Sequence, residues 1–286
     1  MDVVSNVSHA KTQDVDVSYE IQASLCYADQ TKPVYKNLRM TLPKQTFTCL
    51  LGESGCGKTS LLRQITGFDD GSSQSECIVT EVNKGVRRTV TLSDSIAYMA
   101  QQDLLMPWLN SLENVLLCDY LTQPLWHKWR RNTAKKEREK RDKALFLLET
   151  LGLVEAAYKA PNQLSGGMRQ RVALARTLMQ DKPVVLMDEP FAALDAINRY
   201  RLQDLAAEML AEKSVVLVTH DAQEAIRLGQ QILVFPNQRD NQESDVQPVF
   251  DFVRPSFPET AIPRPINAEL GRYQAALLQA MEAVPC

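Results

Sequence analysis

The stretch Gly52-Glu53-Ser54-Gly55-Cys56-Gly57-Lys58-Thr59 follows an apolar run, Phe47–Leu51, and precedes a segment of helical character, Thr59–Thr66. It matches the pattern Gly-x4-Gly-Lys-Ser/Thr, in which glycines let successive backbone N–H groups converge on phosphate oxygens. The start of the following helix adds its dipole. Lys58 can reach the β- and γ-phosphates of a nucleotide, and the Thr59 hydroxyl can hold Mg²⁺. The stretch therefore predicts a strand–loop–helix unit that binds a nucleoside triphosphate.

The segments on either side of this loop alternate between strand and helix patterns. Period-2 alternation before residue 46 predicts antiparallel strands, and short strands are expected over residues 72–100. A helical pattern extends from about Ser111 to Leu153. Two near-continuous apolar runs, Val184–Met187 and Val215–Val218, suit strands that are buried on both faces of a parallel sheet. A further strand is expected at Ile232–Phe235, and helices are expected at Ala196–Ala211 and Ala268–Met281.

An acidic pair, Asp188 and Glu189, ends the apolar run Val184–Met187. Taken alone, such a pair is more often a helix cap or a solvated turn. In a parallel sheet, however, the carboxyl ends of the strands form the ligand-binding edge. Beside a phosphate loop, the pair therefore predicts that Asp188 holds Mg²⁺ through water and that Glu189 polarises the attacking water as a general base.

A second predicted anion-binding helix start lies in Leu164-Ser165-Gly166-Gly167-Met168-Arg169-Gln170-Arg171, ahead of a helix expected over Met168–Met179. Two such sites in one chain make sense if this one completes the site of another subunit. The segment resembles the signature of the ATP-binding cassette (ABC) ATPases. The resemblance covers about residues 15–235 and implies ATP and Mg²⁺ as ligands. It also implies a head-to-tail homodimer, with ATP between Lys58 of one subunit and Ser165 and Gly167 of the other.

The resemblance implies an α/β fold with three parts. These are a P-loop NTPase (RecA-like) core with an N-terminal antiparallel β subdomain, an inserted α-helical subdomain, and a tail. The expected boundaries are 1–100 and 165–235 for the core, 101–164 for the helical subdomain with the glutamine loop and permease contact, and 236–286 for the tail with its short helix.

The same resemblance assigns the remaining site residues. Gln101 matches the glutamine that senses Mg²⁺ and the attacking water; Gln102 is the alternative, but alignment on Pro107-Trp108 favours Gln101. His220 matches the histidine that contacts the γ-phosphate. Ala193-Leu194-Asp195 resembles the loop that touches the partner subunit. The expected nucleotide-binding residues are Gly52, Ser54, Gly55, Cys56, Gly57, Lys58, Thr59, Ser60, Ser165, Gly166, Gly167 and Asp195.

Tyr27 matches the aromatic residue that stacks on adenine. Tyr19 and Tyr35 lie nearby in the sequence, and any of the three tyrosines could instead be a core or strand residue.

The region Leu104–Val115, with Ala193–Ala196 and Glu224–Ile226, resembles importers of the nitrate, sulfonate and taurine group, which includes transporters of thiamine-precursor pyrimidines. This implies an ATPase that powers import of a small nutrient. Its expected partners are integral-membrane permease subunits and, indirectly, a periplasmic substrate-binding protein. We expect a peripheral position at the cytoplasmic face of the inner membrane, because the sequence contains neither a signal peptide nor an apolar run of the roughly 20 residues that cross a bilayer.

Two other functions are alternatives: a soluble ABC ATPase that acts on nucleic acid, and an exporter-type motor. The interval between Lys58 and Ser165 is too short for the coiled-coil insertion of repair ATPases, and Pro107-Trp108 argues against an exporter. The net charge of −3 gives no support to nucleic-acid binding. The basic segment His127–Lys143 is most simply a solvated helix with local salt bridges, with lipid or nucleic-acid contact as alternatives.

The six scattered cysteines indicate free thiols. We expect no barrel-like regulatory domain of the kind found in sugar importers, because only a short stretch follows Phe235.

Overall fold

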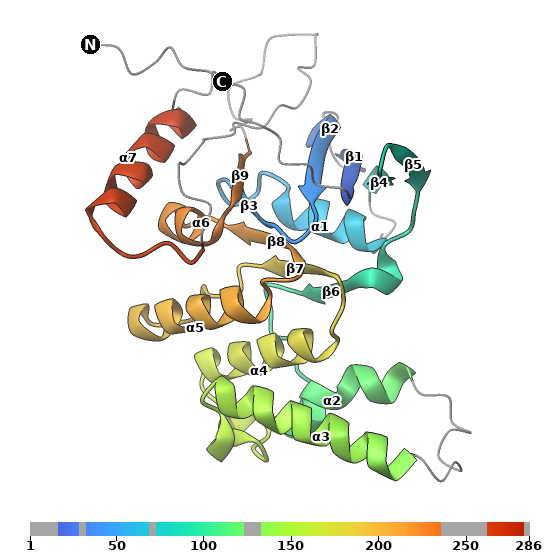
Figure 1. Cartoon of the computed structure of the whole chain (residues 1–286), viewed down its shortest axis with the longest axis vertical. Coiled ribbons are helices and arrows are strands. Elements are labelled where there is room, and N and C mark those ends of the chain that lie inside the picture. Colours follow the sequence, from blue (N-terminus) through green and yellow to red (C-terminus); the bar gives the residue numbers. More distant parts are fainter. Residues whose placement is uncertain (1–16, 29–32, 69–72, 123–132, 236–261, 283–286) are drawn as a thin grey trace.

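The computed structural model describes residues 17–28, 33–68, 73–122, 133–235 and 262–282 (Figure 1). These residues form an antiparallel sheet in the order β2-β1-β4-β5 and a parallel sheet in the order β6-β7-β8-β3-β9. The antiparallel strands are β1 (Val17–Tyr27), β2 (Tyr35–Pro43), β4 (Ser73–Asn83) and β5 (Val86–Thr89). The parallel strands are β3 (Phe47–Leu51), β6 (Ile96–Met99), β7 (Val184–Asp188), β8 (Ser214–Thr219) and β9 (Gln231–Val234).

The antiparallel sheet has one buried side. Along β2, Leu38, Met40 and Leu42 are buried, whereas the residues between them are exposed. Such alternation is typical of a sheet with one face on a core and one face in solvent. β1 pairs antiparallel with both β2 and β4, so the antiparallel strands predicted before residue 46 are confirmed.

The parallel sheet is buried on both faces, and its strand residues alternate between two apolar cores. Leu50 and Leu186 face the core that also contains the antiparallel sheet and α1 (Lys58–Thr66). Leu51 and Met187 face the core that contains α4, α5 and α6. The bounds of these helices are Gly166–Met179, Ala196–Met209 and Ala222–Leu228. Helices α1 and α4 therefore cover opposite faces of the sheet.

Helices α2 (Ser111–Thr122) and α3 (Thr133–Thr150) pack on each other and on α4. Together with the loop 100–110 they form what we call the helical lobe, which lies at the bottom of Figure 1. Short 3₁₀ turns lie at Val154–Ala156 and Pro161–Gln163, between α3 and α4, and another at Ser93–Ser95 precedes β6. The last helix, α7 (Ala268–Glu282), packs on α6.

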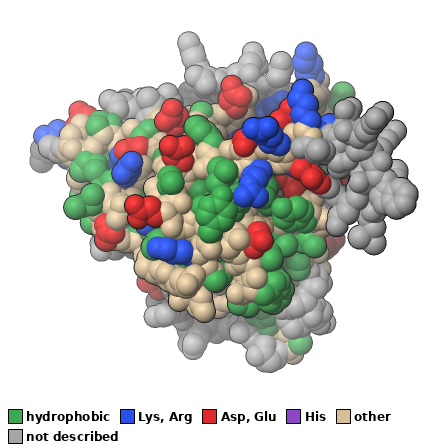
Figure 2. All heavy atoms as spheres, turned by 90° about the horizontal axis from the view of Figure 1, so that it is seen from below, with side chains coloured by type: hydrophobic (Ala, Val, Ile, Leu, Met, Phe, Trp, Pro, Cys, Tyr) green, Lys and Arg blue, Asp and Glu red, His purple; other side chains and the backbone are tan. Residues whose placement is uncertain are grey.

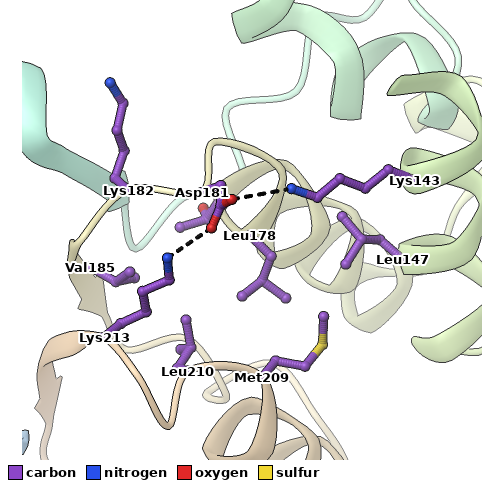
Figure 3. A pocket seen from close by; sticks show the side chains of 10 residues that line it. Lys143, Leu147, Leu178, Asp181, Lys182, Val185, Met209, Leu210 and Lys213 are labelled. Atoms are coloured by element: carbon purple, nitrogen blue, oxygen red, sulfur yellow. Dashed lines mark hydrogen bonds and ion pairs between the residues drawn. The ribbon is translucent and has the colours of Figure 1, made fainter. Parts of the chain in front are cut away.

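A pocket of about 180 Å³ lies where the helical lobe meets the core, at the edge of the sheet where β7 and β8 begin (Figure 3). Asp181, in the turn after α4, links the two parts. Its Oδ1 lies 2.8 Å from Lys213 Nζ, beside β8, and its Oδ2 lies 3.7 Å from Lys143 Nζ, on α3. The apolar lining comes from Leu147, Leu178, Val185, Met209 and Leu210.

The described part of the basic segment is the start of α3, and residues 127–132 lie outside the described ranges. Lys135 pairs with Glu139 one turn along the same helix, and Lys140 pairs with Asp119 of α2. Lys143 adds its pair with Asp181. This agrees with the prediction of a solvated helix with local salt bridges.

Five of the six cysteines lie in the described ranges, and each of these is a free thiol. Cys286 lies outside those ranges. Within the described residues, no helix combines the length and the apolar character needed to cross a membrane.

Candidate nucleotide-binding site

The phosphate loop occupies residues 52–57, between the end of β3 and the start of α1. Gly55 and Gly57 have φ angles of 86° and 100°, in the left-handed region that favours glycine. A Cβ atom on Gly57 would also lie 2.8 Å from Cγ1 of Val34, so a side chain cannot fit there. The backbone of this loop thus takes a shape that other residues would not adopt.

Lys58 is held inside the loop that precedes it. Its side chain is 5% exposed, and Nζ donates to the carbonyl oxygens of Gly52 at 2.9 Å and Glu53 at 2.6 Å. These bonds keep the ammonium group at the N-terminal end of α1, where the helix dipole also favours anions. The lysine and the backbone amides can therefore act on the same phosphate group.

Asp188 ends β7 and is buried, with 1% of its surface exposed. Neither carboxylate oxygen makes a hydrogen bond of good geometry. Burial raises the pKa of Asp188, although the nearby Thr59 hydroxyl and Lys58 act in the opposite direction. An ionised carboxylate without partners is costly to bury, so this arrangement suits a group that a cation would satisfy.

The Thr59 hydroxyl and the Asp188 carboxylate are hard oxygen ligands of the kind that Mg²⁺ prefers, so the residues fit this ion. No group of three or more His, Cys, Asp or Glu side chains in the described ranges could hold a metal ion by itself. A magnesium ion at this position would therefore depend on the oxygens of the nucleotide's phosphates and on water.

Three side chains meet at the ends of the adjacent strands β6, β7 and β8. Glu189 Oε1 lies 3.0 Å from His220 Nδ1, and Gln101 Nε2 donates to Glu189 Oε2 at 3.4 Å. The sheet order explains this meeting, because each residue follows the carboxyl end of its strand. Of the two glutamines considered from the sequence, Gln101 is the one with this hydrogen bond to Glu189.

The backbone of Glu189 is fixed on two sides. Its φ angle is 49°, a conformation that costs a non-glycine residue about 1–3 kcal/mol and that other contacts must stabilise. The amide donates to the carbonyl of Val218 at 3.0 Å, and the carbonyl accepts from Gln170 Nε2 at 3.0 Å. Gln170 Oε1 also accepts from the amide of Ala193 at 3.1 Å.

Gln170 was not predicted as a site residue, although it lies inside the Leu164–Arg171 motif. Glu224 was not predicted as one either, and it appeared only within the subfamily resemblance. Glu224 is buried and shares with Glu189 and His220 the lining of a pocket of about 60 Å³. Burial raises the pKa of Glu224 to about 7. Gln203 Nε2 donates to its carboxylate at 3.1 Å.

Ser165 is the N-cap of α4, and its hydroxyl accepts from the amide of Met168 at 3.2 Å. The next turn is close-packed: a Cβ on Gly167 would lie 3.2 Å from Cδ2 of Leu194. Asp195 caps α5 in the same way, and its hydrogen bonds from Asn198 lower the pKa of its carboxyl. The 165–167 turn and the 193–195 turn thus form one surface on the α4 side of the sheet.

Tyr27 lies at the end of β1, beside α1. Its hydroxyl is 2.5 Å from Oγ of Ser60, one residue after Thr59. Tyr35 is a core residue: it is 2% exposed and its hydroxyl donates to Gln64 Oε1 at 2.7 Å. Tyr19 is half-buried against the same core. Tyr27 is thus next to the phosphate loop, and its stacking on adenine stays a prediction.

The loop 100–110 joins Gln101 to the helical lobe and is tied to α4. Arg169 Nε donates to Asp103 Oδ2 at 2.9 Å, and Arg176 donates to the backbone carbonyls of Asp103 and Leu104. The buried Asn114 accepts from the amide of Met106 at 2.7 Å and donates to three carbonyl oxygens of the loop. These bonds join the loop 100–110 to both α4 and α2.

Comparisons with known proteins agree with this geometry. Residues 35–192 match the ABC transporter family. An uncharacterised ABC transporter ATP-binding protein of Haemophilus influenzae is 40% identical over 90% of this chain and 95% of its own length. A taurine import ATP-binding protein of Rhizobium johnstonii is 37% identical over 79% of this chain and 80% of its own length. An aliphatic sulfonates import ATP-binding protein of Paracoccus denitrificans is 35% identical over 71% of this chain and 73% of its own length.

Solved structures show the same relationship. A dimeric ATP-binding cassette in a post-hydrolysis state, bound to ADP and Pi, superposes with a TM-score of 0.60 at 30% identity. The match covers 76% of this chain and 93% of that chain. The P-loop NTPase fold expected from the sequence is therefore confirmed, and this chain is an ATPase that belongs to the ABC transporter family.

Proposed function

We propose that this chain is the ATP-hydrolysing subunit of a membrane importer for a small nutrient. The names of the taurine and aliphatic sulfonate relatives support the importer class, and they favour a small anionic or zwitterionic cargo of that kind. A bicarbonate transport ATP-binding protein of Synechocystis at 37% identity points to the same class of cargo. The thiamine-precursor option rests on the sequence resemblance alone.

The meeting of Gln101, Glu189 and His220 beside the phosphate loop carries the catalytic part of the proposal. In this account the loop amides and Lys58 bind the phosphates of ATP. A magnesium ion held by Thr59 and Asp188 would neutralise charge on the β- and γ-phosphates. Glu189 polarises the attacking water, while His220 holds the Glu189 carboxylate and contacts the γ-phosphate. Gln101 completes the shell around that water.

The two faces of the sheet support the proposal of a homodimer. Helix α1, with Lys58, and helix α4, with Ser165 at its start, cover opposite faces, so one chain supplies two separate half-sites. The dimeric cassettes among the solved relatives support pairing of the half-sites between two chains. ATP would then stabilise the closed dimer, and loss of the γ-phosphate would let it open.

The helical lobe is the proposed contact for the permease subunits. Apolar side chains gather on the face seen in Figure 2. Within the helical lobe, Trp108, Leu121 and Phe146 expose 75%, 75% and 60% of their surfaces. A contiguous apolar patch on a protein surface is typical of an interaction site. Because α4 holds the loop 100–110, motion of the permease would move Gln101 and the 165–167 turn together. The chain would act as a peripheral protein on the cytoplasmic side.

Purification of the tagged chain from membranes in mild detergent tests this proposal. Mass spectrometry should find a polytopic membrane protein in stoichiometric amount. Trp108→Asp should weaken that association. The control variant Tyr200→Phe, on the α5 side of the core, should not. Recovery of the chain without any membrane protein, or together with nucleic acid, would contradict the importer assignment and favour a soluble ATPase.

A further inference from the structure

The segment 262–282 returns to the core and packs beside α6 (Figure 1). Leu270 and Leu277 of α7 are 2% and 0% exposed and belong to the same apolar core as α6. This contact is formed by residues that lie beyond the part of the sequence in which the ABC resemblance was found. The segment therefore needs its own physical explanation.

Arg264 is the most buried charged residue of this segment, with 3% of its surface exposed. Its backbone amide donates to the carbonyl of Arg227 at 2.9 Å. Its guanidinium donates to the carbonyl of Gly229 at 2.8 Å and to the carbonyl of Ile226. All three acceptors lie in or just after the last turn of α6, where helix carbonyls lack partners within the helix.

This position favours a cation twice over. The C-terminal end of a helix carries partial negative charge, and an arginine there also satisfies the orphan carbonyl groups. A buried guanidinium without these acceptors would cost free energy, so the three bonds hold Arg264 at the end of α6. The chain leaves α6 in close contact with its last turn, because a Cβ on Gly229 would lie 2.6 Å from the carbonyl oxygen of Ala225.

The other end of α6 is attached to the catalytic histidine. The N-cap of α6 is Asp221, the residue after His220, and it accepts from the amides of Gln223 and Glu224. Helix α6 has only seven residues, so about 10 Å of hydrogen-bonded helix separates the carbonyls that Arg264 holds from His220. A displacement at its C-terminal end is therefore carried to His220 and to the 3.0 Å contact with Glu189.

We propose that Arg264 is a positioning residue for ATP hydrolysis: it fixes the C-terminal end of α6 and thereby holds His220 against Glu189. The C-terminal segment 262–282 thus sets the turnover rate from outside the nucleotide site. This inference rests on the proposed role of His220 in catalysis. A purely stabilising role for Arg264 makes a different prediction, because it would not depend on His220.

A double-mutant cycle on the full-length chain separates the two roles. Arg264→Met should lower kcat by about tenfold or more while the KM for ATP changes by less than about twofold. Arg264→Lys should restore part of the rate, because a lysine can reach one carbonyl. Arg272→Met, which changes an exposed arginine of α7, should leave kcat unchanged. In a His220→Ala background, whose residual rate requires long incubation, Arg264→Met should lower kcat no further.

Equal loss of kcat from Arg264→Met in the wild-type and His220→Ala backgrounds would overturn the proposal, and so would an unchanged kcat per folded molecule. If Arg264→Met does not fold, Arg264→Lys serves for the same cycle. A wild-type rate in His220→Ala alone would instead refute the catalytic role of His220, and with it the basis of this inference. A slow His220→Ala together with a fast Arg264→Met would refute only the role of Arg264.

Discussion

Nδ1 of His220 lies 3.0 Å from Oε1 of Glu189, although the two residues follow different strands. The contact arises because β7 and β8 are neighbours in the parallel sheet and both residues come directly after the carboxyl ends. Glu189 is only 15% exposed at its side chain, so the histidine closes the open side of the carboxylate. This pair belongs to the proposed hydrolytic site.

Complementation between two inactive chains tests whether the sites are shared. Lys58→Ala removes the phosphate-binding ammonium, and Ser165→Arg blocks the opposite half-site. In a head-to-tail dimer of one mutant chain with the other, one site keeps both native residues. We therefore expect a mixture of the two to hydrolyse ATP, whereas each mutant alone should be nearly inactive. A mixture as inactive as either mutant, despite dimers detected by size-exclusion chromatography, would contradict the shared site.

Glu224 should make the stability of the protein depend on pH. Burial, together with the nearby charge of Asp221, raises the pKa of Glu224 from 4.5 to about 7 in the folded chain, against the smaller lowering effects of Thr219 and Gln203. Between these two values the folded chain binds a proton that the unfolded chain has released. Stability from this group is therefore present at low pH and is lost as pH rises towards 7.

Glu224→Gln imitates the protonated form and should remove that loss. The mutant should gain up to about 3 kcal/mol in unfolding free energy relative to wild type between about pH 5 and pH 8. Urea unfolding at several pH values measures this. Glu208→Gln, which changes an exposed glutamate of α5, is the control and should follow the wild-type curve. A Glu224→Gln curve parallel to wild type would show that Glu224 is not protonated in the folded protein.

Asp181 should contribute modestly to the joint between the helical lobe and the core (Figure 3). Its hydrogen bond with Lys213 and the charge of Lys143 lower the pKa of its carboxyl. A carboxyl whose pKa is lowered by folding stabilises the folded chain at pH values above its ordinary pKa. This stabilisation is lost as the pH falls through the lowered pKa. The pair is 65% exposed at the carboxylate, so Asp181→Asn should cost less than about 1 kcal/mol at pH 7.

Urea unfolding at low and at high salt measures the contribution of Asp181. The difference between Asp181→Asn and wild type should shrink with added salt and disappear near pH 3, because screening and protonation both remove the ion pairs. A difference that survives both conditions would mean that Asp181 acts through its backbone conformation, where its φ angle is 50°, rather than through its charge.

The phosphate loop, and the acidic pair at the ligand-binding edge of the parallel sheet, could be predicted because each is encoded by a short stretch of sequence. A glycine pattern fixes a loop shape, and residues that directly follow a strand of a parallel sheet lie at the edge where ligands bind. The positions of Gln101 and His220 came from family resemblance, and the structure brings both to Glu189. The bounds of α5 differ from the expectation by two residues at its end, as fraying helix ends often do.

Gln170, Glu224 and Arg264 could not be found in this way. Each acts through backbone or side-chain groups that are distant in sequence: Gln170 through Glu189 and Ala193, and Arg264 through Ile226 and Gly229. A glutamine within a helix or an arginine after a proline carries no periodicity signal of its own. Only the contacts of α4 with the backbone of Glu189 and Ala193, and of the C-terminal segment with α6, reveal these partners.

Glu189→Gln tests the central claim most directly. The amide keeps the size of the side chain but cannot accept a proton, so the mutant should bind ATP with the affinity of wild type and lose turnover by about 10²–10⁴-fold. Glu208→Gln serves as the matched control. Equilibrium binding of a fluorescent ATP analogue and phosphate release measure the two quantities in parallel. Tight binding with slow release is the predicted result; turnover close to wild type would show that Glu189 is not the base.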